Sequence, residues 1–226
     1  YLIEKKLSPL NWYEIEGEIL ENSQEFGGID IGLDVDICIK LNSHKKIQKE
    51  KKFAPKTLAF DIETDEIKIG EGEILMVALA SEGFNKVITW KKPKDKKKID
   101  YVEYVEDEAE LIEKFVEHVR KISPDFLVGY FSDGFDLPYL KARAEKHNVK
   151  LSLNLDNSQP KFSRGASLTA KTKGIVHVDL LKFIRTAYSQ YMKAETLSLN
   201  EVAKEFLGDK KKPFEHKHSS KVKDWE

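Results

Sequence analysis

Two acidic residues stand where their carboxylates could hold a metal ion. Asp61 and Glu63 lie two positions apart at the end of a mostly apolar run, residues 57–62. In a β-strand, residues i and i+2 point to the same face, so these carboxylates would project side by side from a buried element. Burying such charges is costly unless a positive charge neutralises them. A divalent cation such as Mg²⁺, which prefers oxygen ligands, would do so. An ion-paired strand end is the alternative interpretation.

Asp136 is the third candidate. It closes the polar turn 132–136 after a short apolar segment and begins a predicted helix, with Pro138 in the first turn, where proline is tolerated. The alternative is that Asp136 only caps this helix. Neither signal is decisive by itself. Taken together, the three acids predict one common site that holds divalent cations.

The elements that must position these acids form a mixed α/β pattern from residue 57 onward. The run 57–62 is typical of a central strand covered on both faces. Asp107 and Glu110 form a capping-box-like pair that opens a helix, and Gly208 ends the last one. Further strands are predicted at 73–80, 86–90, 126–130 and 175–178, helices at 107–122, 136–147, 180–189 and 197–207, and a hairpin within 162–172.

The first 52 residues have a different character. Alternation of apolar and polar residues predicts a half-buried strand at 29–41, with a weaker candidate at 12–19. The basic stretch 44–52 has the composition of a linker. We therefore expect a small β-rich appendage with its linker, residues 1–52, followed by one larger α/β domain, residues 53–226.

Composition limits the classes of protein. With 226 residues the chain can form one domain and an appendage. A formal net charge of −1 argues against a globally basic surface, so any nucleic-acid site is a local patch. The single cysteine, Cys38, favours a reducing compartment. No run approaches the roughly 18 apolar residues of a membrane span. The ends of the chain, Tyr1 and Glu226, suggest a fragment of a longer protein.

Two segments resemble a known family. Residues 60–64 (FDIET) are similar to the first exonuclease motif of the archaeal family B DNA polymerases, and residues 129–140 (GYFSDGFDLPYL) are similar to the second. Similar sequence continues at 174–179 (GIVHVD) and 196–199 (TLSL), so the resemblance covers nearly the whole chain. The resemblance implies that residues 53–226 are a 3′→5′ proofreading exonuclease domain with an RNase H-like (DnaQ-like) α/β fold, a mixed sheet flanked by helices. It also implies that residues 1–52 are the remnant of the polymerase N-terminal domain with its linker.

The resemblance also implies roles for the three acids. Asp61, Glu63 and Asp136 would hold two Mg²⁺ or Mn²⁺ ions, with Asp61 bridging them, Glu63 orienting the attacking water and Asp136 supporting the second ion. The substrate would be the 3′ end of single-stranded or frayed primer DNA. The palm, fingers and thumb of the parent polymerase would be partners, as could a sliding clamp. The expected location is cytoplasmic and nucleoid-associated, with no membrane.

The chain departs from the family pattern at two points. Phe131 occupies the place of a usual Asn, so a stacking ring could replace that residue's contact with substrate. The third motif, a Tyr followed four positions later by Asp, has no match. Tyr191 with Glu195 has the spacing but the wrong acid. We therefore expect a chain truncated before the third motif and weak or inactive by itself.

Several other residues have two interpretations each. Arg164 and Lys171 could contact phosphate from the hairpin, or belong to an ordinary surface hairpin. Asp179 is more simply a helix cap than an acid supporting the metal ligands. His216 and His218 are expected to be solvated.

Two other functions remain open. The domain could be a non-catalytic scaffold or DNA-binding module, for which a metal titration would find no site. It could also be an RNA-trimming nuclease, which a comparison of DNA and RNA substrates would identify.

Overall fold

The structure is a computed structural model, and it describes residues 2–9, 11–20, 37–48, 54–92, 99–164 and 168–208, with the side chain of Arg164 excepted. These residues form two compact units. One comprises residues 1–54 with 155–157, and the other comprises residues 55–154 with 158–226. Each unit is described by itself below. His216 and His218 lie outside the described residues.

The first unit contains a two-stranded antiparallel ribbon, β1 (Trp12–Ile19) and β2 (Ile39–Ile47). The strand at 12–19 is confirmed. Of the strand predicted at 29–41, residues 29–36 lie outside the described part and β2 begins at Ile39. The linker predicted from His44 is wrong over 44–47, which continue β2. The basic residues there are compatible with a strand because Lys45 lies opposite Glu14, a favourable cross-strand pair.

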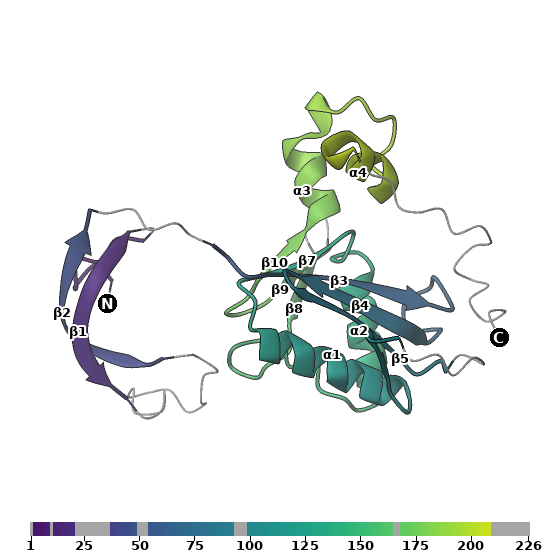
Figure 1. Ribbon diagram of the computed structural model, residues 1–226, viewed down its shortest axis with the longest axis horizontal. Coiled ribbons are helices and arrows are strands. Elements are labelled where there is room, and N and C mark those ends of the chain that lie inside the picture. The colour runs from purple at the N-terminus through teal and green to yellow at the C-terminus, as the bar shows by residue number, and fades with distance from the viewer. Residues whose placement is uncertain are drawn as a thin grey trace. The chain divides into compact units, whose positions relative to one another are not determined.

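The second unit is built on a six-stranded mixed sheet in the order β10-β7-β3-β4-β5-β6 (Figure 1). β3 is antiparallel to β4 and parallel to β7, so the strand that carries Asp61 and Glu63 lies inside the sheet. Five of the six strands were predicted within two residues at each end, and β6 was not predicted. The strands span β3 (Thr57–Thr64), β4 (Ile74–Ser81), β5 (Phe84–Thr89), β6 (Val102–Tyr104), β7 (Phe126–Gly129) and β10 (Val176–Asp179).

Two helices cover one face of this sheet. α1 (Glu108–Ile122) begins at Asp107, whose side chain accepts the Glu110 N–H, and ends at Ser123 in the left-handed conformation. α2 (Asp136–Lys146) follows the second motif. Their buried side chains meet those of the strands in one core, which includes Leu58, Phe60, Ile62, Val77, Leu79, Leu111, Phe115, Val119, Leu137 and Leu140. The predicted mixed sheet flanked by helices is therefore confirmed.

The other face of β3 is open, which corrects one expectation. Burial alternates along the strand, with Leu58, Phe60 and Ile62 buried and Thr57, Ala59 and Asp61 exposed in the described structure. The apolar run hid this alternation because Ala59 counts as apolar. A groove of about 550 Å³ lies on this face. Its lining includes Ala59, Asp61, Ala78, Ala80, Val128, Tyr130, Leu180 and Leu199.

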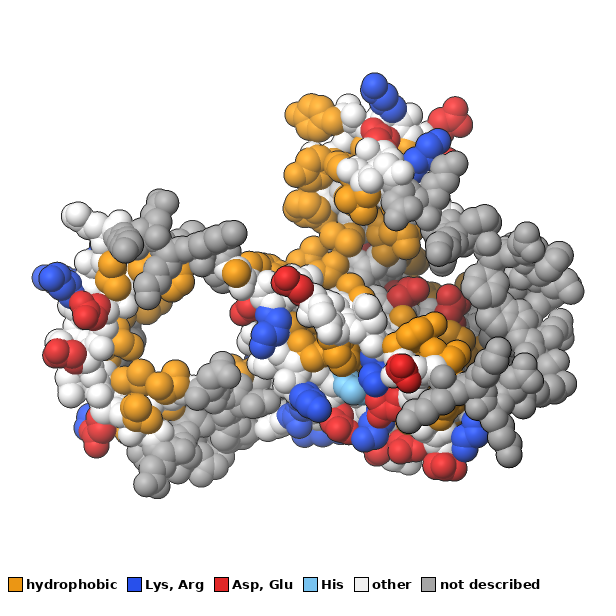
Figure 2. Space-filling model, in the orientation of Figure 1, with side chains coloured by type: hydrophobic (Ala, Val, Ile, Leu, Met, Phe, Trp, Pro, Cys, Tyr) orange, Lys and Arg blue, Asp and Glu red, His pale blue; other side chains and the backbone are white. Residues whose placement is uncertain are grey.

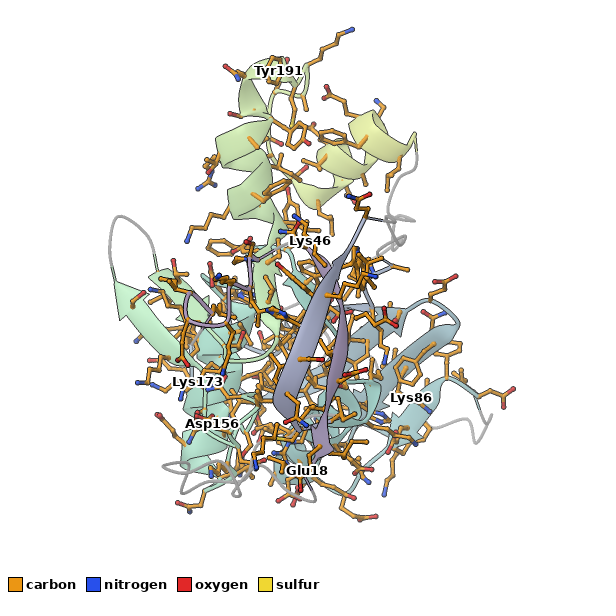
Figure 3. All side chains as sticks on the ribbon, turned by 90° about the vertical axis from the view of Figure 1, so that its left-hand side faces the viewer. Glu18, Lys46, Lys86, Asp156, Lys173 and Tyr191 are labelled. Atoms are coloured by element: carbon orange, nitrogen blue, oxygen red, sulfur yellow. The ribbon has the colours of Figure 1, made fainter. Side chains whose placement is uncertain are left out.

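Beyond β10 the chain forms α3 (Leu180–Ala187), a single 3-10 turn (Ser189–Tyr191) and α4 (Leu199–Leu207). Gly208 ends α4 at φ +68°, as predicted. The rings of Phe183, Tyr188 and Phe206 contact one another, and Figure 2 shows hydrophobic side chains gathered over α3. Tyr191 lies at the tip of this segment, away from the sheet (Figure 3).

The predicted hairpin is present as β8 (Lys161–Arg164) and β9 (Leu168–Lys171). Among the described residues, no helix is both long enough and apolar enough to cross a membrane.

Candidate active site

β3 places Asp61 and Glu63 on one face of the sheet. Asp61 is exposed and Glu63 is partly buried, while the residue between them, Ile62, points into the core. This is the strand alternation that the spacing predicted. Both acids lie near the end of β3, where its ladder with β7 has already stopped, because β7 pairs only with Thr57–Ala59.

The missing pairing is supplied by Asp136. Its Oδ1 accepts the Ile62 N–H at 3.2 Å, across 74 positions of sequence. Asp136 is the first residue of α2 and is 3% exposed, and the N-cap residue Phe135 makes no side-chain capping bond. Asp136 is thus more than a helix cap, since its carboxylate joins α2 to the backbone between the other two acids.

The surroundings of Asp136 disfavour the charged form of its carboxyl group. Burial, with the negative charge of Asp61 adding to it, raises the pKa of Asp136 from 3.8 to about 7. No basic side chain among the described residues forms an ion pair with Asp136. Two acids that repel each other, with only oxygen donors, fit a hard divalent cation. Within the described part of the chain, however, no three His, Cys, Asp or Glu side chains are already arranged round one ion position.

The turn before α2 carries an exposed aromatic ring. Phe131 is 50% exposed and has φ +64°, a left-handed conformation that is uncommon outside glycine. Its carbonyl accepts the N–H groups of Gly134 and Phe135 at 2.9 and 3.0 Å. A side chain at Gly134 would collide with the ring, because a Cβ there would lie 2.3 Å from Phe131 Cε2. Gly134 therefore lets the ring fold over the turn.

Three buried polar side chains lie beneath this turn, and the sequence did not predict their contacts. Ser132 Oγ lies 2.9 Å from His177 Nε2, and His177 Nδ1 lies 3.5 Å from Asp133 Oδ1. Burial lowers the pKa of His177. The arrangement has the residue types of a hydrolase triad, but Ser132 is fully buried and cannot meet a substrate. The one sequence signal was a polar His inside the apolar strand 175–178.

The hairpin is attached to the same turn. The Ala170 N–H donates to Asp133 Oδ1 at 2.7 Å, and Lys182 Nζ lies 2.5 Å from Thr169 Oγ1. Lys171, next in sequence to Ala170, is exposed. Arg164 lies in β8 opposite Leu168, and its side chain is outside the described part. The structure thus connects the hairpin to the second motif, without bringing Lys171 into a recorded contact with the acids.

Comparison with known proteins finds one family over most of the chain. The family model for the exonuclease domain of family B DNA polymerases matches residues 1–202. A DNA polymerase of Pyrococcus glycovorans is 45% identical over 134 residues, 58% of this chain and 17% of that protein. A DNA polymerase of Pyrococcus horikoshii is 38% identical over 174 residues, 75% of this chain and 13% of that protein. The chain thus spans less than a fifth of the length of these relatives.

The fold has a solved counterpart. The structure of the family B DNA polymerase from Pyrobaculum calidifontis matches 90% of this chain and 24% of its own length, with a TM-score of 0.59 and 22% identity. That likeness supports the RNase H-like arrangement of sheet and helices. Exonuclease domains of this family are metal-dependent nucleases. With a family match over most of its length and the motif acids on β3 and α2, the chain belongs to the exonuclease domains of the family B DNA polymerases.

Proposed function

We propose that this domain removes mispaired nucleotides from the 3′ end of primer DNA by hydrolysing the terminal phosphodiester. The observation that carries the proposal is the hydrogen bond from the Ile62 N–H to Asp136 Oδ1, which brings the third acid to the backbone between Asp61 and Glu63. An acid placed only to cap α2 would have no reason to reach β3.

Asp61, Glu63 and Asp136 would hold two divalent cations, Mg²⁺ or Mn²⁺. When bound, the cations promote formation of the nucleophile from water and stabilise negative charge on the departing 3′ oxygen. Asp61, exposed on the open face of the sheet, would contact both cations. Glu63, on the same face, would orient the attacking water, and Asp136 would hold the second cation from the start of α2.

Phe131 would contact the DNA by stacking on a base near the 3′ end. Its ring is half exposed and held over Gly134, so little freedom is lost on binding. Stacking of a base on an aromatic side chain contributes about 1–3 kcal/mol. Arg164 and Lys171 of the attached hairpin would contact backbone phosphates.

Replacing Phe131 by alanine should weaken binding of single-stranded DNA by about 5- to 150-fold, the equivalent of about 1–3 kcal/mol. The measurement is fluorescence anisotropy of a labelled oligonucleotide in EDTA, where no cleavage occurs. Phe183→Ala is the matched control, since Phe183 is also 50% exposed but lies on α3. Equal affinities for wild type and Phe131→Ala would show that the ring does not stack on DNA.

The domain would act on the primer end delivered by the palm, fingers and thumb of a longer polymerase, at the nucleoid in the cytoplasm. A sliding clamp is a further partner of such an assembly. These partners are inferred from the relatives, which are DNA polymerases several times longer than this chain.

A single-turnover nuclease assay tests the proposal. With enzyme in excess over 5′-labelled single-stranded DNA, we expect slow stepwise shortening from the 3′ end, as befits a chain in which the third motif has no match. This shortening should require Mg²⁺ or Mn²⁺ and disappear in Asp61→Ala. Calorimetric titration with Mn²⁺ should show binding to wild type that Asp61→Ala weakens. Absence of any Mn²⁺ site would support the scaffold alternative, and faster cleavage of RNA than of DNA would support an RNA-trimming nuclease.

A further inference from the structure

Asp179 makes more contacts than a helix cap needs. It is the last residue of β10 and is 7% exposed. Oδ1 accepts the Lys182 N–H at 3.2 Å, which is the cap of α3. Oδ1 also accepts the Phe131 N–H at 3.1 Å, and Oδ2 accepts the Asp133 N–H at 3.0 Å. Two of its three contacts therefore go to the second-motif turn, 46 to 48 residues earlier.

Capping alone does not require these contacts. α4 is capped by Ser198, whose single hydroxyl accepts the Glu201 N–H at 3.3 Å. α1 is capped by Asp107 through one carboxylate oxygen, which accepts the Glu110 N–H at 2.9 Å. A serine at 179 would serve the helix equally well. Serine has only one side-chain oxygen, so it lacks the second oxygen with which Asp179 reaches the turn.

The turn needs an acceptor at this point. The left-handed conformation of Phe131, at φ +64°, is unfavourable for a residue with a side chain. The Asp133 N–H is buried, and a buried donor left without a partner destabilises the fold. The carboxylate of Asp179 stabilises both features at once. Because residues 131 and 133 are held on either side of Ser132, the Ser132 carbonyl is held as well. That carbonyl accepts the Leu137 N–H at 3.1 Å and so fixes the start of α2.

We propose that Asp179 is a positioning residue of the exonuclease site, which acts through the backbone of residues 131–133 to hold the Phe131 ring and the Asp136 carboxylate in place. This inference rests on the proposed function. Asp179 itself touches neither substrate nor metal in this scheme. Asp179 fixes the position of the Asp136 carboxylate to which the cations bind.

Asp179→Ser is the discriminating variant, because its one hydroxyl oxygen can keep the cap of α3 while the Oδ2 contact to the Asp133 N–H is lost. We expect Mn²⁺ affinity, measured by electron paramagnetic resonance, to fall about tenfold or more, the usual effect of losing a residue that orients metal ligands. Amide hydrogen exchange of Phe135 and Leu137, which donate to the turn rather than to Asp179, should accelerate by a similar factor. Asp107→Ser makes the same exchange at α1 and should change neither quantity.

Asp179→Asn provides a second variant in case Asp179→Ser does not fold. It preserves size and one acceptor oxygen but presents an NH₂ group to the Asp133 N–H, so Mn²⁺ affinity should again fall. Normal Mn²⁺ affinity in folded Asp179 variants would overturn the inference and leave the proposed function standing. If wild type and Asp61→Ala bind Mn²⁺ equally, the proposed function itself is wrong and the positioning role falls with it.

Discussion

Asp136→Asn is expected to stabilise the metal-free protein at pH 8 while removing its metal-dependent activity. Burial and the charge of Asp61 raise the pKa of Asp136 to about 7, from 3.8. Ionisation of Asp136 in the folded protein therefore costs up to about 4 kcal/mol, taking roughly 1.4 kcal/mol for each of about three pKa units. Asparagine keeps the oxygen that accepts the Ile62 N–H and carries no charge.

The sign of the pH dependence follows from linkage. The folded protein holds the proton of Asp136 more tightly than the unfolded chain, so folding stability falls as pH rises from about 4 to about 7. The Asp136→Asn variant does not lose stability in this way, because asparagine does not ionise. The gain in stability should therefore be near zero at pH 4 and reach its full value above pH 7. At about 2–4 °C per kcal/mol, the melting temperature at pH 8 should rise by several degrees.

The activity should change in the opposite direction. Loss of residues that only orient metal ligands costs about 10- to 100-fold, so loss of a ligand should reduce the cleavage rate by at least about 100-fold. Calorimetry in EDTA measures the stability, and the single-turnover assay measures the rate. Asp107→Asn is the control, since Asp107 also accepts a backbone N–H, from Glu110 at 2.9 Å, but is exposed, so its replacement should not stabilise. A lower melting temperature for Asp136→Asn at pH 8 would refute the electrostatic account.

Local signals in the sequence were sufficient for the elements that carry the site. Asp107 and Gly208 marked helix ends that the structure has in the same places. The spacing of Asp61 and Glu63 predicted their shared face because strand periodicity is a property of neighbouring residues. The same reasoning wrongly predicted that β3 is covered on both faces, since Ala59 counts as apolar whether or not anything packs on it.

The contacts that join the elements could not be predicted in this way. The Ile62–Asp136 bond spans 74 positions and the Asp133–Asp179 bond spans 46. Which carboxylate oxygen meets which backbone N–H depends on where β7 stops pairing with β3 and on how the turn bends at Phe131. Neither is a property of a short segment. The residues that position the site were therefore less visible in the sequence than the acids that form it.

Replacing Arg143 by methionine is expected to be the most destabilising of these substitutions. Arg143 on α2 is 1% exposed, and its Nε donates to Glu108 Oε1 at 2.7 Å while a second guanidinium nitrogen binds Glu108 Oε2. Glu108, in the first turn of α1, also accepts the Ile74 N–H at 2.7 Å. This buried pair joins both helices to β4. Removing one partner of a buried ion pair typically costs about 3–5 kcal/mol.

Two further variants separate an uncompensated charge from a lost side chain. Glu108→Gln combined with Arg143→Met removes the charge as well, so most of the stability should return, because a buried pair replaced as a whole is often nearly neutral. Arg120→Met, at an exposed position in the last turn of α1, should change stability by less than about 0.5 kcal/mol. Chemical denaturation measures all three against wild type.

Lowering the pH should reduce the difference in free energy of unfolding between wild type and Arg143→Met. Burial by itself would raise the pKa of Glu108, but hydrogen bonds from Arg143, the Ile74 N–H and His147 outweigh it and hold the pKa below 4.5. A carboxylate with a lowered folded-state pKa stabilises the fold above its unfolded pKa, and this contribution is lost as pH falls through the folded-state value. The cost of Arg143→Met should therefore be full at pH 7 and shrink below pH 4. A cost that stays constant from pH 7 to pH 3 would mean that Arg143 stabilises the helices by packing rather than by its charge.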